Sequence, residues 1–109
     1  MPPPLAVPLA LTPRIKAAIQ ALEPDATVIL YGSRARGSAQ ADSDWDLLVL
    51  VDGVVDLSRK RAIRRALYDL EWETGEVITS AIKNREAWNA PRLRVSPFYQ
   101  AVARDGVTL

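Results

Sequence analysis

Apolar residues recur along this chain with two different periods, and the alternation of the two divides it into helices and strands. Residues 13–23 and 57–73 carry apolar positions at helical spacing, so both segments are predicted to be amphipathic helices. Three shorter segments, 27–31, 45–51 and 76–82, are rich in apolar and β-branched residues and are predicted to be strands. The second of these strands is apolar almost throughout, which indicates burial on both faces of a sheet.

Shorter helices are predicted within residues 33–40, 84–88 and 96–104, where capping residues precede short helix-forming runs. The resulting order is α-β-α-β-α-β-α. It predicts a single α/β domain with a small mixed central β-sheet, flanked by helices that pack mainly on one face.

The N-terminal segment differs from the rest in composition. Residues 1–11 contain four prolines and are predicted to form an extended or poorly ordered arm, which leaves residues 12–109 as the domain. Thr12 is expected to cap the first helix, and Pro13 is expected to occupy its first position.

The composition narrows the chemistry that this domain can perform. The chain has 109 residues and a formal net charge of +1, so no global electrostatic argument points to nucleic acid or a membrane. It contains neither cysteine nor histidine, which excludes disulfides, thiolate ligands and Ser-His or Cys-His catalysis. Any metal must be held by carboxylates, which favours magnesium or manganese. Without a signal-peptide pattern or an apolar run of about 20 residues, a cytoplasmic protein is expected.

Two features stand at the ends of neighbouring predicted strands. Asp44 and Asp46 open the second strand, and because alternate residues of a strand share a face, they project together while Trp45 points the other way. Two adjacent carboxylates repel each other and favour a divalent cation with oxygen preference. Gly32 and Ser33 end the first strand at the start of a helix, where a backbone without a side chain and free N–H groups favour an anion. An anion site beside an acidic pair is what nucleotidyl transfer requires.

These residues carry a resemblance to a known family. Gly32-Ser33, ten intervening residues and Asp44-Trp45-Asp46-Leu47 resemble the signature of the nucleotidyltransferase (polymerase-beta-like) superfamily. The surrounding residues 31–37, Tyr-Gly-Ser-Arg-Ala-Arg-Gly, and Ser43 resemble more specifically the minimal nucleotidyltransferase (MNT) proteins. Those proteins are commonly encoded beside a HEPN-domain partner, as the antitoxin of a toxin–antitoxin pair.

The resemblance implies a nucleotidyltransferase fold and a role for each matching residue. Gly32 and Ser33 would hold the triphosphate of a nucleotide, with ATP as the donor. Asp44 and Asp46 would bind two Mg²⁺ ions, with Mn²⁺ as an alternative. The superfamily's third acidic residue lies on a later strand, and here the acid near the start of the third predicted strand is Glu76 rather than the usual aspartate. Glu76 would then complete the metal site; if it is instead a solvated residue at the strand end, the chain binds nucleotide and metal but catalyses poorly.

For two other polar residues near this signature, two alternative roles are predicted. Arg36 could bind phosphate or pair with Asp42 or Asp44, and Ser43 could orient a carboxylate or close the loop. Arg34 is expected at the surface.

The tryptophans and the basic face of the helix at 57–73 are predicted to have structural roles. Trp45, Trp72 and Trp88 are expected to be core or interface anchors. The basic residues within 59–65 are expected to form a solvated helix face or to meet a partner's acidic surface rather than nucleic acid.

Three functions remain open at this point. The first, implied by the resemblance, is transfer of AMP from ATP to a tyrosine hydroxyl of a HEPN-domain toxin. The second is a catalytically weak or inactive antitoxin that neutralises its partner by direct binding. The third is the donor half of an antibiotic-modifying transferase, which is less favoured because little chain remains after Glu76 to build an acceptor region.

Overall fold

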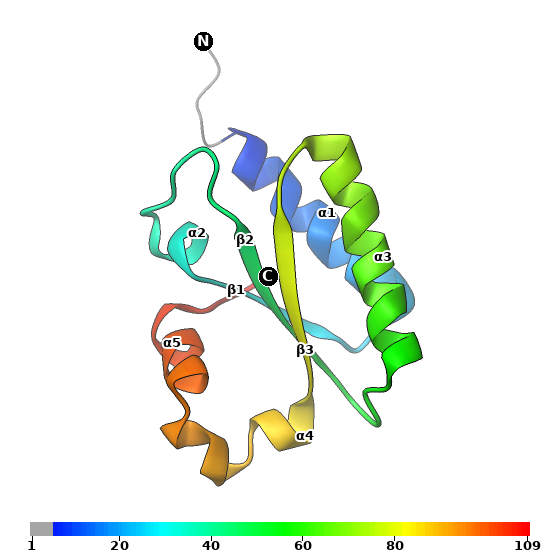
Figure 1. Ribbon diagram of the computed structural model, residues 1–109, viewed down its shortest axis with the longest axis vertical. Coiled ribbons are helices and arrows are strands. Elements are labelled where there is room, and N and C mark those ends of the chain that lie inside the picture. Colours follow the sequence, from blue (N-terminus) through cyan, green and yellow to red (C-terminus); the bar gives the residue numbers. More distant parts are fainter. Residues whose placement is uncertain (1–5) are drawn as a thin grey trace.

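The protein is organised around a four-stranded mixed sheet with the strand order β3-β2-β1-β4 (Figure 1). The computed structural model describes the backbone of residues 6–109 and the side chains of residues 11–109. The strands are β1 (Thr27–Tyr31), β2 (Trp45–Val51), β3 (Ile78–Asn84) and β4 (Val107–Thr108). β1 runs antiparallel to both β2 and β4, and β2 runs parallel to β3. This confirms the predicted fold class, and β1 and β2 occupy the predicted residues.

β2 forms the centre of the core because its residues are apolar on both faces. Leu47, Val49 and Val51 point into one apolar cluster, and Leu48 and Leu50 point into another on the opposite face. All five side chains are at most 5 % exposed. The continuous apolar run therefore has the double burial that the sequence predicts for it.

Two long helices cover the first face of the sheet and lie side by side (Figure 1). They are α1 (Ala6–Leu22) and α3 (Leu57–Thr74). Ile15 and Ile19 of α1 and Ile63 of α3 are fully buried against this face. Asp56 caps the start of α3 and its carboxylate accepts a hydrogen bond from Arg59 N, while Gly75 caps the end of α3 in the left-handed conformation.

The opposite face is covered by three short helical elements, α4 (Arg85–Trp88), the 3₁₀ helix η1 (Pro91–Val95) and α5 (Pro97–Asp105). Trp88 and Val102 pack there on Leu48 and Leu50. The prediction that the helices lie mainly on one face is therefore wrong, because the even-numbered residues of β2 are as apolar as the odd-numbered ones and also need cover.

The structure corrects two predicted boundaries. α1 begins at Ala6 rather than at Pro13, so residues 6–11 are helical and Thr12 is not a cap. Leu11 is 2 % exposed and extends the buried stripe of Ile15 by one turn, and this packing offsets the backbone hydrogen bond that Pro13 cannot donate. The remainder of the expected arm, residues 1–5, lies outside the described residues. β3 begins two residues later than predicted, so Glu76 precedes the strand.

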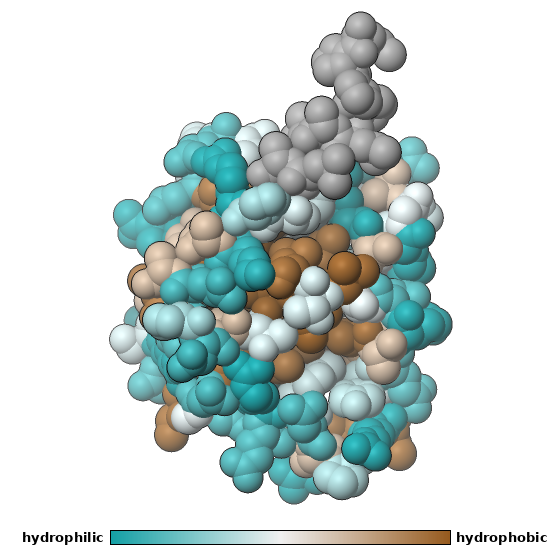
Figure 2. Space-filling model, turned by 180° about the vertical axis from the view of Figure 1, so that it is seen from behind, coloured by the Kyte–Doolittle hydropathy of each residue, from teal (hydrophilic) through white to brown (hydrophobic). Residues whose placement is uncertain are grey.

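The surface mixes apolar and polar areas. Viewed from behind, apolar residues gather near the centre of the molecule and hydrophilic residues surround them (Figure 2). Of the three tryptophans, which are expected to be core or interface anchors, Trp45 and Trp88 are buried in the core and Trp72 is 75 % exposed on α3. Within the described part of the chain, no helix is both long and apolar enough to cross a membrane.

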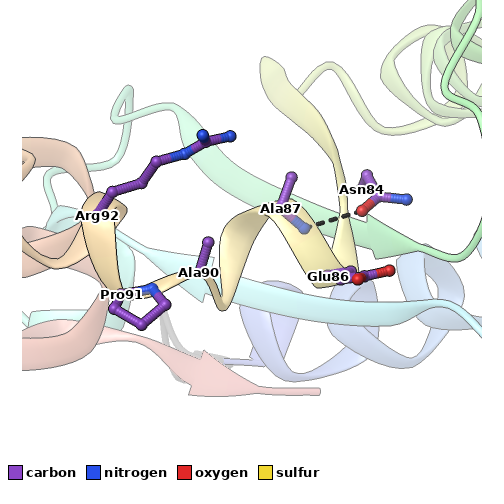
Figure 3. Close-up of a pocket in the computed structure, with 6 residues that line it drawn as sticks. All are labelled: Asn84, Glu86, Ala87, Ala90, Pro91 and Arg92. Atoms are coloured by element: carbon purple, nitrogen blue, oxygen red, sulfur yellow. Dashed lines mark hydrogen bonds between the residues drawn. The ribbon is translucent and has the colours of Figure 1, made fainter.

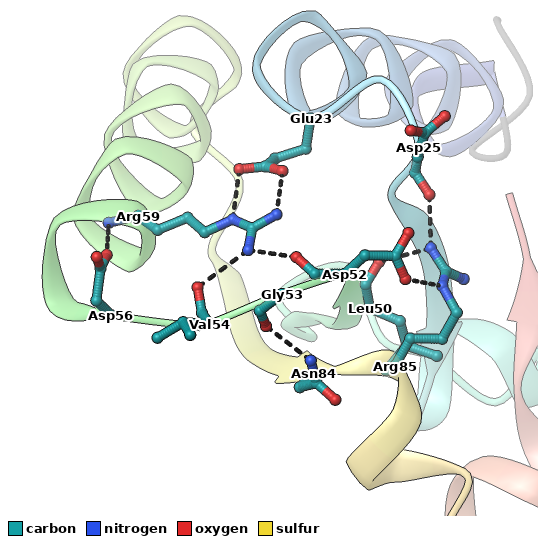
Figure 4. A network of polar contacts seen from close by, with 10 residues as sticks. All are labelled: Glu23, Asp25, Leu50, Asp52, Gly53, Val54, Asp56, Arg59, Asn84 and Arg85. Carbon is teal, nitrogen blue, oxygen red and sulfur yellow. Dashed lines mark hydrogen bonds and ion pairs between the residues drawn. The ribbon is translucent and has the colours of Figure 1, made fainter.

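A network of polar contacts closes the end of the sheet where β2 stops (Figure 4). Arg59 donates two hydrogen bonds to the carboxylate of Glu23, at 2.7 and 2.8 Å, and further ones to the carbonyl oxygens of Asp52 and Val54. Arg85 pairs with the carboxylate of Asp52 at 2.9 Å. Arg59 therefore links the turn after β2 to the end of α1 and the start of α3, and Arg85 links the same turn to the end of β3.

The Arg59–Glu23 pair predicts how stability depends on pH. The hydrogen bond from Arg59 holds the pKa of the Glu23 carboxyl below its ordinary value. A lowered folded-state pKa stabilises the fold above the unfolded-state pKa, and this contribution is lost as the pH falls through the folded-state value. We expect Arg59→Met to lower the free energy of unfolding by about 1–2 kcal/mol at neutral pH, allowing for partial exposure, and by less at acid pH.

Urea unfolding of both proteins across the acid range measures this effect. Arg65→Met is the matched control, because Arg65 contacts Asp69 on the exposed face of α3 and both side chains are more than half exposed. A constant difference between wild type and Arg59→Met at all pH values would contradict the prediction.

Candidate functional site

The predicted acidic pair lies where β2 begins. Asp46 is the second residue of β2, is partly buried and stands in register with Tyr31 of β1 and Thr79 of β3. It precedes Leu48 on the face that α4 and α5 cover, while Trp45 is 1 % exposed and packs into the cluster on the other face. Asp44 directly precedes the strand and is exposed. The alternation thus separates Trp45 from Asp46, as predicted.

The carboxylate of Asp46 has Thr79 on one side and Gly32 on the other. Thr79 Oγ1 donates a hydrogen bond to Asp46 Oδ1 at 2.7 Å. On the other side lies Gly32, with φ 74° and ψ −158°, where a Cβ atom would lie less than 3.0 Å from Asp46 Oδ2. Glycine is therefore required at position 32 both for its backbone conformation and for the close approach of a carboxylate. The structure brings Gly32 and Asp46 together from two neighbouring strands.

The segment after Gly32 forms a single helical turn, α2 (Ser33–Arg36). It is shorter than the predicted helix because Gly37 ends it in the left-handed conformation. The carbonyl oxygen of Gly32 accepts hydrogen bonds from Ala35 N and Arg36 N, both at 3.1 Å. Gly32 occupies the cap position, so Ser33 is the first helical residue and not the cap, and its side chain is partly buried next to the Gly32 turn.

The structure does not bring Glu76 to the acidic pair. Glu76 Oε2 accepts a hydrogen bond from the indole Nε1 of Trp45 at 3.2 Å and lies 3.5 Å from Arg34 Nη2. Trp45 faces the opposite side of the sheet from Asp46, so the Glu76 carboxylate is directed away from that side. Across residues 11–109, no group of three or more Asp, Glu, His or Cys side chains is placed to hold a metal ion.

The residue of β3 that does reach Asp46 is Thr79, which sequence reasoning missed. The predicted strand begins at Glu76, two residues before β3 begins, so an acid is expected where the structure has Thr79. In the parallel register, Trp45 pairs with Ile78 and Asp46 with Thr79. A threonine hydroxyl donates to the carboxylate and orients it, but it brings no charge to a cation.

Arg36 and Ser43 have structural contacts in place of the predicted ones. The guanidinium of Arg36 lies 3.3 Å from Asp105 of α5, rather than near Asp42 or Asp44. Ser43 Oγ accepts a hydrogen bond from Gln40 N at 2.8 Å, so this hydroxyl closes the loop before the acidic pair. Arg34, expected at the surface, has a side chain that is only 10 % exposed.

Tyr31 is a further residue beside Asp46 that the sequence analysis did not single out. It is the register partner of Asp46, and its ring meets Phe98 edge-on with 5.3 Å between centroids. Burial raises the pKa of the Tyr31 phenol above its ordinary value, and the charge of Asp46 raises it further. The phenol therefore stays protonated at neutral pH next to the carboxylate.

The two aspartates fit one kind of cation site and not another. Mg²⁺ is commonly bound through one or two carboxylates, with phosphate oxygens and water completing its coordination. Asp46 offers one carboxylate oriented by Thr79, and the exposed Asp44, two residues earlier, is available as the second. They do not form the three-carboxylate site that the resemblance implies, because Glu76 contacts Trp45 and Arg34.

A pocket of about 470 Å³ lies elsewhere, between the end of β3 and the short helices (Figure 3). Its lining includes Asn84, Glu86 and Arg92. Asn84 pairs with Val51, at the opposite end of β3 from Thr79. None of the predicted site residues lines this pocket.

The fold is of the α/β class, with a mixed sheet and with the Asp46 carboxylate lying against the Gly32 turn. The sequence profile of the nucleotidyltransferase domain family matches residues 13–98. The chain belongs to that family, which confirms the resemblance at this level.

One solved structure is similar to this chain in fold. It is described as "Crystal structure of the toxin-antitoxin with AMP-PNP" and superposes with a TM-score of 0.62 at 18 % sequence identity. The match covers 88 % of this chain and 69 % of the other. No functionally curated protein matches the sequence.

Proposed function

We propose that this protein is a nucleotidyltransferase of the antitoxin type, which transfers AMP from ATP to a hydroxyl group of a partner toxin. The acceptor would be a tyrosine of a HEPN-domain protein. The observation that carries the proposal is the placement of Asp46 directly against Gly32, with Asp44 two residues away, in a chain of the nucleotidyltransferase family.

The residues of the site support this role in different ways. Gly32 carries no side chain where it lies beside the Asp46 carboxylate, and Ser33, which follows it, is partly buried. Asp44 and Asp46 would hold Mg²⁺ on the triphosphate, and the ion would neutralise phosphate charge and stabilise the leaving pyrophosphate. The acceptor oxygen would attack the α-phosphorus, the bond to the β-phosphate oxygen would break, and the hydroxyl proton would pass to solvent.

A protein partner is supported by the fold neighbour and by the surface of this chain. The neighbouring structure is a toxin–antitoxin with AMP-PNP. In this chain the side chains of Tyr68 and Trp72 are 51 % and 75 % exposed on α3, and their rings meet edge-on at 6.1 Å. Exposed aromatic residues of this kind are enriched at protein interfaces.

A second candidate function is favoured by one specific observation. Glu76, the expected third acid, contacts Trp45 and Arg34 instead, which leaves Asp44 and Asp46 as the acids of the proposed site. A chain with this site would bind nucleotide and metal but activate an acceptor hydroxyl poorly. It would then act as an antitoxin by direct complex formation.

Incubation with ATP labelled at the α-phosphate tests the first function. The protein, Mg²⁺ or Mn²⁺ and the protein encoded next to it are combined, and label on either protein is measured by gel and by mass spectrometry. We expect label on a hydroxyl of the partner and release of pyrophosphate. Stable complex formation without transferred label, at any metal concentration, would favour the second function.

A further inference from the structure

Arg34 is a largely buried cation, with its side chain 10 % exposed, and it contacts the chain on both sides of Asp44. Its Nη2 atom donates hydrogen bonds to the carbonyl oxygens of Ser43 at 3.0 Å and Ala41 at 3.3 Å. Its guanidinium carbon lies 4.5 Å from the centre of the Trp45 ring. Because Ser43 precedes Asp44 and Trp45 follows it, one side chain touches both sequence neighbours of that aspartate.

Glu76 completes this arrangement from the β3 side. The same Oε2 atom accepts from Trp45 Nε1 at 3.2 Å and lies 3.5 Å from Arg34 Nη2, with the Glu76 side chain 20 % exposed. The hydroxyl of Thr74 accepts from Glu76 N at 3.2 Å, just after the end of α3. Glu76 therefore links the Trp45 indole and the Arg34 guanidinium to Thr74 at the end of α3.

We propose that Arg34, Trp45 and Glu76 form a clamp that positions Asp44 for the cation of the proposed nucleotide site. This inference rests on the proposed function. Arg34 and Glu76 are positioning residues in it. They act through the loop that carries Asp44, and Glu76 serves the site without binding the metal.

Stability alone is a weak explanation for these contacts. The Arg34 side chain is only 10 % exposed, and its Nε atom has no hydrogen-bond partner among the described residues. Desolvating a charge in this way is costly, and a buried ion pair often contributes no more than apolar packing of the same volume. The planar guanidinium does, however, lie over the Trp45 ring while its Nη2 atom donates to two carbonyl groups, so one side chain holds a ring and two backbone groups in one geometry.

The contrast with Arg36 supports the assignment. Arg36 lies in the same helical turn, but its side chain is 47 % exposed and contacts Asp105. Arg34 instead joins α2, the 38–44 loop and the start of β2. Asp46 is oriented separately by Thr79 and lies against Gly32, so the clamp sets the position of one aspartate relative to the other.

Mn²⁺ affinity, measured by electron paramagnetic resonance with and without AMP-PNP, tests the clamp. We expect Arg34→Gln to weaken Mn²⁺ binding by about 10-fold to 100-fold, the usual cost of losing a group that orients a metal ligand. Arg34→Lys, which keeps the charge but loses the planar guanidinium over the Trp45 ring, is expected to weaken binding nearly as much. Arg61→Gln is the matched control, because Arg61 is exposed on α3 and carries the same charge.

Two comparisons separate positioning from metal ligation. If Arg34 acts through Asp44, Arg34→Gln has no further effect on Mn²⁺ affinity once Asp44 is replaced by asparagine. Glu76→Gln retains an oxygen that accepts from Trp45 Nε1, so it is expected to weaken Mn²⁺ binding less than Arg34→Gln. The reverse order would make Glu76 a metal ligand and overturn the inference.

Hydrogen exchange of the amides of residues 41–46 provides a readout that needs no metal. We expect faster exchange in Arg34→Gln and Arg34→Lys than in wild type or Arg61→Gln, with unchanged exchange in β1. Unchanged exchange of the loop would overturn the clamp. A wild-type protein that binds neither Mn²⁺ nor AMP-PNP would refute the proposed nucleotide site, while the exchange rates would still decide whether Arg34 holds the loop.

Discussion

Replacing both Asp44 and Asp46 by asparagine is expected to abolish nucleotidyl transfer and Mn²⁺ binding while the fold is retained. Asparagine has the same shape as aspartate, and its side-chain oxygen can still accept the hydrogen bond from Thr79 that Asp46 accepts. The change removes two negative charges, which are the groups expected to attract the cation. It also removes the repulsion between them, so the free energy of unfolding should stay equal or rise.

The same double variant distinguishes the two proposed functions. If the protein is an enzyme, the variant should bind the partner toxin but fail to neutralise it in growing cells. If it is an antitoxin by direct binding, the variant should neutralise the toxin as well as wild type does. Asp42→Asn is the matched control, because Asp42 is exposed in the loop just before the pair. Loss of transfer in Asp42→Asn as well would assign the effect to the loop and not to the acidic pair.

The parts of the fold that the sequence predicts well are those whose signal is local. β1 and β2 occupy the predicted residues because each is a compact apolar run bounded by polar or turn-forming residues. The same local pattern predicted that Asp46 and Trp45 face opposite sides, and Trp45 is indeed buried while Asp46 borders Gly32.

The wrongly predicted boundaries come from tertiary contacts between different elements, which no local pattern in the sequence shows. Val77 suggests a strand, but it is 51 % exposed, and Glu71 of α3 accepts the hydrogen bond from Ile78 N where β3 begins. That tertiary contact sets the start of β3 and places Thr79, rather than an acid, opposite Asp46. A two-residue shift in a strand boundary thus changes the composition of the candidate site.

The position of Arg34 shows a second limit of sequence reasoning. Arg34 and Arg36 stand two residues apart in one helical turn, and nothing local distinguishes a buried arginine from an exposed one. The difference depends on tertiary contacts of Arg34 with Trp45, at the start of β2, and with Glu76, just after α3. The first helix shows the same effect, since burial of Leu11 extends α1 past Pro13.

Replacing Gly32 by alanine is expected to damage both the fold and the site. The φ and ψ values of Gly32, 74° and −158°, lie in a region that is essentially restricted to glycine, and occupying it with another residue costs about 1–3 kcal/mol. The new Cβ would in addition lie less than 3.0 Å from Asp46 Oδ2 and 3.3 Å from its Cγ. The carboxylate or the turn must therefore move, and Mn²⁺ affinity should fall along with the melting temperature.

Gly75→Ala is the control for a positive φ without a collision, although Gly75 has ψ 4° where Gly32 has −158°. Gly75 also has φ 74°, but a Cβ built there meets nothing within 4 Å and the residue is remote from Asp46. We expect both variants to lower the melting temperature, by about 4–8 °C for each kcal/mol in a domain of this size, and only Gly32→Ala to lose Mn²⁺ binding.

A double-mutant cycle isolates the collision with the carboxylate. In an Asp46→Ala background the nearest remaining atom of residue 46 is its Cβ, which lies 3.5 Å from the place that a Cβ at position 32 would take, an ordinary contact. Gly32→Ala should therefore destabilise that background less than it destabilises wild type, and the difference measures the coupling between the two positions. Equal destabilisation in both backgrounds would mean that glycine is needed at position 32 only for its backbone conformation. The close approach of the Asp46 carboxylate would then not contribute to the requirement for glycine.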